Sequence, residues 1–262
     1  MEVGSGLAIF GSAKLIEKLL GPTCEYLGQN IQQLTKKMHD NIAKIFINAE
    51  SKLGDRINQE GTVPPKVLKS IIENGAWCEE ELQCEYFGGV LASSRSSISR
   101  DDRGAYLSNL VSELSSYQIR MHYLIYSEIH RLFSDKEFNV CESAIRNKLE
   151  IFIPLSTYLE AFDYSEEELK RVFELTPHIL FGLSNAGLIE NNFQYGPQES
   201  LKKKYPDANS YGIIVQPSQK GVELYMWAYG RGFEPLTSFF GSSKKFKSID
   251  GIKIGQAFPT RK

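Results

Sequence analysis

The sequence predicts a mainly α-helical protein with a smaller α+β part toward its C-terminal end. Apolar residues recur at steps of three and four over residues 104–133, which is the spacing of one buried helix face. Two short helical patterns, an extended polar stretch, a β-rich run and a last helix follow, in the order of a winged helix. We therefore expect a multi-helix domain over residues 1–163, a winged-helix-like domain over 164–235, and a loosely structured basic and aromatic tail over 236–262.

Composition indicates a globular protein of ordinary type. The chain has 262 residues, of which 42% are hydrophobic and 24% are charged. The formal net charge is −2, so no global positive field points to a nucleic-acid partner. The four cysteines form no C-x-x-C pair, and the N-terminal stretch lacks the basic start of a secretory signal. We expect reduced thiols, no metal, no cofactor and a cytoplasmic location.

The N-terminal third is predicted to consist of helices. Residues 1–20 carry a short apolar face, which we expect to dock as a helix; a membrane-active segment is the alternative. A near-heptad apolar stripe predicts a helix over residues 23–53, capped by Gly54. That stripe favours intramolecular packing, and a homo-oligomer is the alternative.

Two further helices are expected before the central stretch. Pro64-Pro65 favours a helix start, and Asn74-Gly75 favours its end. Residues 79–93 predict a helix whose acidic beginning suits the helix dipole. Around it, the residues expected in the core are Trp77, Leu82, Tyr86, Phe87, Val90 and Leu91.

The central stretch is predicted as one helix over residues 104–133, a rod of about 45 Å. Asp101 and Asp102 precede it, where a helix N-terminus favours negative charge. Residues 135–163 are expected to continue as helix, with Pro154 causing a kink or a break.

Polar side chains interrupt the apolar stripe of this central helix. Gln118 and His122 are four residues apart and so share a helix face, while Arg95, Arg100 and Arg103 precede them. We predict a partner-binding cluster from these five residues; a buried hydrogen-bond network is the alternative. An enzyme that uses Arg95, Asp101, Asp102, Gln118 and His122 is a further hypothesis, although nothing here has the spacing of a known nucleophile and base pair.

The C-terminal third carries clear boundary signals. Residues 165–168 read S-x-x-E, a capping box that predicts a short helix ending near residue 175. Thr176-Pro177 predicts the start of a second helix and Gly187 its end. Residues 211–215 predict a strand, and 218–230 a last helix.

The winged-helix-like part carries polar and basic residues that could contact a nucleic acid. His178 and Asn185 are polar residues of its second helix, which has no Lys or Arg. Lys202, Lys203 and Lys204 would lie on the wing, where they could touch phosphates. Because a groove-reading helix normally presents basic or bidentate side chains, protein contact and nucleic-acid contact both stay open.

Four stretches resemble the Abi-alpha, or abortive-infection alpha, family of bacterial proteins. They are LLGPTCEYLG (19–28), CEYFGGVLASSR (84–95), LSSYQIRMHYLIYS (114–127) and QPSQKGVELYMWAYG (216–230). Before the last helix the chain has Pro217-Ser218 where the family usually has P-T, and Ser serves equally as an N-cap. The resemblance implies a role in anti-phage defence and carries over no catalytic residue.

These observations predict a non-enzymatic component of bacterial anti-phage defence that binds a protein or nucleic-acid partner. One alternative is a winged-helix nucleic-acid-binding regulator without a defence role. Another is a membrane-active effector that acts through residues 1–20.

Overall fold

The computed structural model describes residues 36–241 and 246–261, and the described chain is mainly helical, as predicted. Residue contacts divide it into two compact units. Unit 1 holds the described residues up to Ser116 together with Met226–Phe233, and unit 2 holds Tyr117–Tyr225 together with the described residues from Glu234 onward. This division differs from the predicted boundary at residue 163. The predicted helix over residues 1–20 and the first part of that over 23–53 lie outside the described residues.

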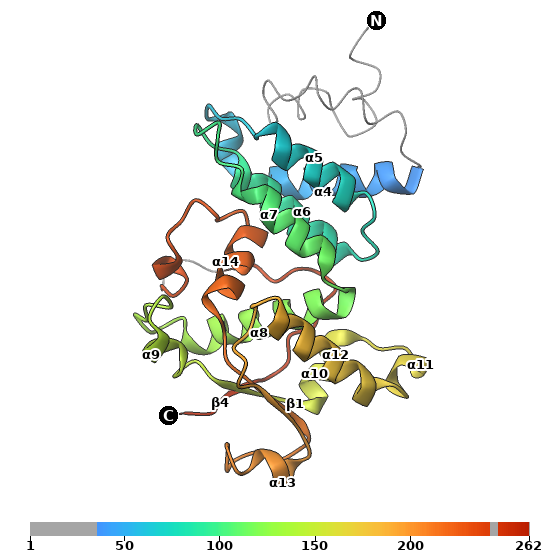
Figure 1. The fold of residues 1–262 in the computed structure, drawn as a ribbon, viewed down its shortest axis with the longest axis vertical. Coiled ribbons are helices and arrows are strands. Elements are labelled where there is room, and N and C mark those ends of the chain that lie inside the picture. The colour runs from blue at the N-terminus through green and yellow to red at the C-terminus, as the bar shows by residue number, and fades with distance from the viewer. Residues whose placement is uncertain (1–35, 242–245, 262) are drawn as a thin grey trace, which may run out of the picture. The chain divides into compact units, whose positions relative to one another are not determined.

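Unit 1 is a group of packed helices (Figure 1). Its elements are α4 (Lys36–Leu53), η4 (Gly54–Asn58), α5 (Pro65–Gly75), α6 (Glu81–Ser94), α7 (Arg103–Glu113) and the end of α14 (Gln219–Ala228). Helix α6 packs against α4 and α7, and α7 also packs against α5. In the described part of the chain, no helix combines the length and apolar character needed to cross a membrane.

The boundary signals of unit 1 are confirmed. Helix α5 begins at Pro65 and ends at Gly75, and Gly54 follows α4 with a φ of 51°. The predicted core residues on α6 are buried, but the prediction for Trp77 is wrong, because its side chain is 70% exposed. Trp77 lies in the connection between α5 and α6, where its neighbours on either side take the buried positions.

Helix α6 and the end of α14 approach each other backbone to backbone. A Cβ atom added to Gly89 would lie 1.8 Å from the carbonyl oxygen of Ala228. One turn further along α6, the Ser93 hydroxyl donates to the Trp227 carbonyl (3.1 Å) and accepts from the Gly232 amide (3.0 Å). Glycine at position 89 is therefore what permits this helix pair to pack.

Unit 2 combines helices with a small sheet. Its elements are α8 (Ser116–Phe133), α9 (Ser143–Arg146), β1 (Ile151–Pro154), α10 (Leu155–Phe162), α11 (Glu166–Leu169), α12 (Val172–Asn185), β2 (Gln194–Gly196), α13 (Gln198–Leu201), β3 (Gly212–Val215), most of α14, η5 (Leu236–Ser238) and β4 (Phe258–Pro259). The four strands are antiparallel in the order β2-β3-β1-β4. Helix α13 lies in the connection between β2 and β3 (Figure 1).

The prediction of one helix over residues 104–133 is wrong, because α7 and α8 are separate helices. Leu114 has an extended conformation, with φ −83° and ψ 134°. The break falls where the apolar stripe is interrupted, between Leu114 and Met121. Ser115 lies between the two helices, and serine favours non-helical conformations because its side chain can bond to nearby backbone groups.

The prediction of helix over residues 135–163 is also wrong, except at α9 and α10. Residues 151–154 form strand β1, which pairs with β3. Strand β3 lies in the segment predicted as a strand, so that prediction is confirmed. Four consecutive buried residues rich in β-branched side chains suit a central strand. Pro154 closes the strand and precedes the first residue of α10.

The prediction that a helix begins at Thr176-Pro177 is wrong, because α12 begins at Val172. The capping box of α11 is confirmed: the Ser165 hydroxyl accepts from the Glu168 amide, and the Glu168 carboxylate accepts from the Ser165 amide. Pro177 lies inside α12, where it removes one backbone bond, and Thr176 bonds back to the Val172 carbonyl (2.7 Å).

The end of α12 follows the prediction. Gly187 has a φ of 72°. Its amide donates to the Ser184 carbonyl (2.9 Å), and the Leu188 amide donates to the Leu183 carbonyl (2.8 Å). This pair of bonds is the Schellman motif that ends many helices.

The C-terminal segment is predicted as loosely structured, whereas its described residues pack on unit 2. The Ala257 amide donates to the fully buried Glu128 carboxylate (2.7 Å), which also binds Arg131. The Ile249 amide donates to the Tyr123 hydroxyl (2.8 Å). Buried side chains of α8 therefore hold the segment through its backbone groups, which the sequence pattern does not display.

Candidate partner-binding groove

An open groove of about 770 Å³ lies in unit 2 between the end of α12 and strand β2. Its walls also include the segment leading into β2 and helix α13. The lining residues, none of which carries a charge, are Phe181, Ser184, Asn185, Asn191, Phe193, Gln194, Tyr195, Ser200 and Leu201. We call this feature the α12–β2 groove.

Aromatic rings form the apolar part of the groove. The Phe181 and Phe193 rings meet edge to face with centroids 5.2 Å apart, and the rings of Phe193 and Tyr195 are nearly parallel at 6.4 Å. Phe181 is 54% exposed although it is a large apolar residue on a helix. Aromatic surface left open to solvent is typical of a binding site.

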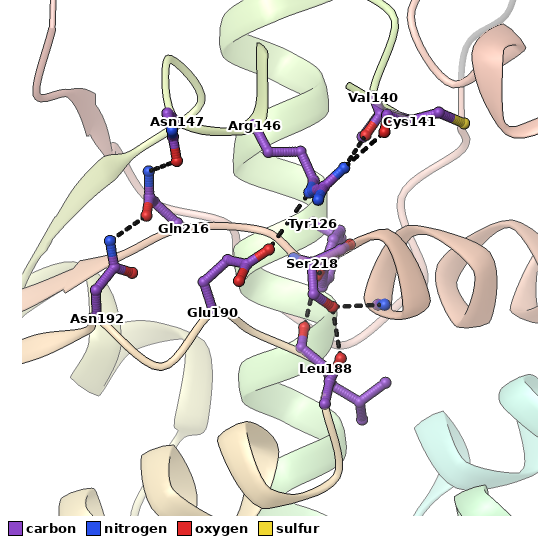
Figure 2. A network of polar contacts seen from close by, with 12 residues as sticks. Tyr126, Val140, Cys141, Arg146, Asn147, Leu188, Glu190, Asn192, Gln216 and Ser218 are labelled. Atoms are coloured by element: carbon purple, nitrogen blue, oxygen red, sulfur yellow. Dashed lines mark hydrogen bonds and ion pairs between the residues drawn. The ribbon is translucent and has the colours of Figure 1, made fainter. Parts of the chain in front are cut away.

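The Tyr126 hydroxyl fixes the turn that follows α12 and leads toward β2 (Figure 2). It donates to the Leu188 carbonyl (2.6 Å) and accepts from the Ser218 amide (3.0 Å). The Ser218 hydroxyl in turn donates to the Gly187 carbonyl (2.6 Å). Burial raises the pKa of Tyr126, so the hydroxyl stays protonated and remains a donor.

Arg146 fixes the next part of the same segment (Figure 2). Its Nη1 atom donates to the carbonyls of Val140 and Cys141, both at 3.0 Å, and its Nε atom lies 3.3 Å from Glu190 Oε1. One guanidinium therefore ties the segment after α8 to the segment that leads into β2.

Amide side chains and a lysine complete the support of the groove. Asn192 donates to the Gln216 side chain, which donates to Asn147 Oδ1 at 3.3 Å (Figure 2). Lys204 Nζ donates to the Asn192 carbonyl (3.1 Å). Asn192 lies between the groove residues Asn191 and Phe193 in the chain, so these bonds support the wall of the groove that leads into β2.

The predicted arginine cluster lies in unit 1. Arg95 is buried, and its guanidinium donates to the carbonyls of Arg56 (3.1 Å) and Gln59 (2.6 Å), which lie in and just after η4. Burial lowers the pKa of Arg95. Arg103 is exposed and forms a bidentate ion pair with Asp101, with both contacts at 2.8 Å, and Arg100 is exposed.

Gln118 and His122 lie in unit 2 and are buried on α8, as the shared face predicts. Gln118 Nε2 donates to the His178 carbonyl of α12 (3.4 Å), and Gly182 leaves room for it. His122 Nε2 lies 3.0 Å from the Gly221 carbonyl. The five residues of the predicted cluster are therefore divided between the two units, with three in unit 1 and two in unit 2.

The predicted nucleic-acid-binding residues lie on two elements of unit 2. His178 and Asn185 are exposed on α12, and Asn185 lines the groove. Lys202 and Lys203 are exposed directly after α13, whereas Lys204 is partly buried and lies 2.6 Å from Glu150 Oε1. Lys204 is therefore engaged within the unit.

We expect Lys204→Ala to lower the free energy of unfolding by about 3 kcal/mol, because it leaves a buried carboxylate without its cation. Glu150 is 1% exposed, and its other contact is the Thr260 hydroxyl at 2.8 Å. Lys202→Ala is the matched control and should change stability by less than about 0.5 kcal/mol. Urea unfolding measures both, and equal values for the two variants would show that the Glu150 pair contributes nothing.

The aromatic residues of the groove are absent from the sequence prediction. The signal that could have found them is the alternation Phe193-Gln194-Tyr195, since residues two apart share a face of a strand. Phe181 gives no such signal, because a phenylalanine on a helix is most often core. The groove arises from tertiary packing of α12 beside β2.

In the described part of the chain, no three His, Cys, Asp or Glu side chains lie together as a metal site. Comparison of the chain with protein-family models, with curated proteins and with solved structures returned no significant match.

Proposed function

We propose that this protein is a non-enzymatic component of bacterial anti-phage defence that binds a macromolecular partner through the α12–β2 groove. The observation that carries the proposal is the groove itself, an open surface whose lining residues are aromatic, aliphatic, amide or hydroxyl side chains without charge. Aromatic enrichment and charge depletion distinguish the centre of a protein interface from ordinary surface.

The order of elements in unit 2 supports a winged-helix-like arrangement with α12 in the place of the recognition helix. Helices α8, α10 and α12 and strands β1, β2 and β3 follow the order helix, strand, helix, helix, strand, strand, and β3 lies between β2 and β1. Helix α12 carries no Lys or Arg, and it exposes Phe173 and Phe181. These features favour a protein partner over DNA, because side chains that read the bases of DNA are usually basic or bidentate.

The burial of the polar residues on α8 supports the non-enzymatic part of the proposal. His122 is fully buried and Gln118 is 7% exposed, so neither presents a group to a substrate. Burial lowers the pKa of His122 to about 3, which keeps the ring neutral at physiological pH. The defence context rests on the resemblance of the four stretches named above to the Abi-alpha family.

Cells that express the protein should resist phage, and Phe181→Ala should abolish most of that protection. We expect the efficiency of plating on Phe181→Ala cells to rise at least about tenfold over wild type, as loss of an interface anchor would produce. The matched control is Phe173→Ala, since Phe173 is also exposed on α12, at 59%, but packs on Tyr211 outside the groove.

Both substitutions remove an exposed ring, so their effects on stability should be small and similar. Equal loss of protection in both variants would contradict a specific role of the groove. Absence of protection by the wild-type protein against a broad phage panel would contradict the defence role.

A further inference from the structure

We propose that the α12–β2 groove takes an extended peptide segment of a protein partner, which pairs with the free edge of β2 and places an apolar side chain against Phe181. The peptide carries acidic residues beside the apolar one. This inference rests on the proposed function and names the chemistry of the partner.

The first support is the position of β2 in the sheet. Among the described residues β2 pairs with β3 alone, and it is a terminal strand in the order β2-β3-β1-β4. A terminal strand presents backbone N–H and C=O groups on its outer side, which an extended peptide can pair with. β4 is the other terminal strand.

The second support is that the groove and this strand share residues. Gln194 and Tyr195 belong to β2 and also line the groove. An added strand would run about 4.8 Å from β2, and alternate side chains of the peptide would face the same side. One of these side chains would reach the ring of Phe181, since Phe181 meets Phe193 directly before the strand.

The third support is the charge beside the groove. Ser200 and Leu201 line it, and the exposed Lys202 and Lys203 follow in the chain. An uncharged aromatic lining selects an apolar side chain, and two exposed lysines directly after a lining residue in the chain favour acidic neighbours. The groove is supported by the bonds of Figure 2, so little ordering is needed when the peptide binds.

The same residues offer less to a nucleic acid. A single strand requires a positively charged track along its backbone together with stacking rings. Of the lysine run, Lys204 is engaged by Glu150 and by the Asn192 carbonyl. The two remaining exposed lysines are too few for a track along a phosphate backbone, whereas they suffice for the acidic residues of a short peptide.

The test is a selection from a displayed library of random ten-residue peptides on the full-length protein. We expect recovered peptides to share apolar residues at alternate positions and to be enriched in Asp and Glu. Synthetic versions should bind Phe181→Ala at least about tenfold more weakly than wild type and Phe173→Ala equally well. Lys202→Ala with Lys203→Ala should weaken binding and reduce its salt dependence.

Backbone methylation then tests the pairing with β2. In an added strand, the amides that bond to the neighbour alternate with amides that point away. N-methylation at every second position of the selected peptide should therefore weaken binding about tenfold, because it removes a donor and adds a clash, while methylation at the positions between should have little effect.

Three results would overturn the inference. Peptides that bind through Phe181 but tolerate N-methylation at every position would exclude strand pairing and leave the proposed function intact. A selection that yields no peptide distinguishing wild type from Phe181→Ala would exclude a peptide partner. Binding of a 20-nucleotide single strand or duplex that is lost in Phe181→Ala would assign the groove to nucleic acid.

Discussion

Gly89→Ala is expected to destabilise the protein by more than about 3 kcal/mol, because an added methyl group would overlap the backbone of the neighbouring helix. The Cβ atom would lie 1.8 Å from the Ala228 carbonyl oxygen and 2.2 Å from its carbonyl carbon. Backbone atoms have no rotamer that relieves such an overlap, so α6 and the end of α14 would have to separate. The bonds that Ser93 makes with Trp227 and Gly232 would be lost with them.

Gly241→Ala is the matched control, since a Cβ at Gly241 would meet no heavy atom of the described residues within 4 Å. Urea unfolding of the two variants gives the comparison. If Gly89→Ala fails to accumulate, its level relative to Gly241→Ala in the soluble fraction gives the same ranking. A Gly89→Ala protein as stable as Gly241→Ala would show that these helices do not approach as closely as the structure has them.

The second large effect concerns stability in acid. Between pH 7 and pH 4 the free energy of unfolding should fall less in His122→Gln than in wild type, by about 3 kcal/mol. His122 is fully buried and contacts the rings of Tyr126 and Tyr225, and burial lowers its pKa to about 3. The unfolded chain has an ordinary histidine pKa of about 6.5, so it binds the proton more tightly. Stability is therefore lost as pH falls from about 6.5 toward 3.

Gln at this position can still donate to the Gly221 carbonyl but cannot titrate. The measurement is the free energy of unfolding of wild type and His122→Gln at several pH values between 7 and 4. His178→Gln, on the exposed face of α12, controls for removal of a histidine. An acid-dependent loss that is the same in wild type and His122→Gln would contradict the buried neutral state of His122.

Several local signals predicted element boundaries correctly, although Thr176-Pro177 did not. The capping box at Ser165, the helix starting at Pro65 and the turn at Gly187 each depend on a few neighbouring residues, and each is found in the structure. Strand β3 was also predictable, because its apolar run is short and flanked by turn residues.

Tertiary packing decided the elements that sequence reasoning missed. Helices α7 and α8 share one apparent stripe, yet the break at Leu114 places them in different units. Residues 151–154 become a strand because β3 and β4 are beside them, and both partners are distant in sequence. The groove was missed for the same reason, since Phe181 and Phe193 meet only after α12 and β2 pack.

Site-specific photo-crosslinking in infected cells tests the central claim that the α12–β2 groove contacts a partner. A photoreactive phenylalanine analogue would replace Phe181 in one protein and Phe173 in another, since both side chains are exposed on the same helix. We predict a covalent adduct at position 181 that protease removes and nuclease does not, and little adduct at position 173. No adduct at position 181 in a protein that still protects cells, or equal adducts at both positions, would contradict the claim.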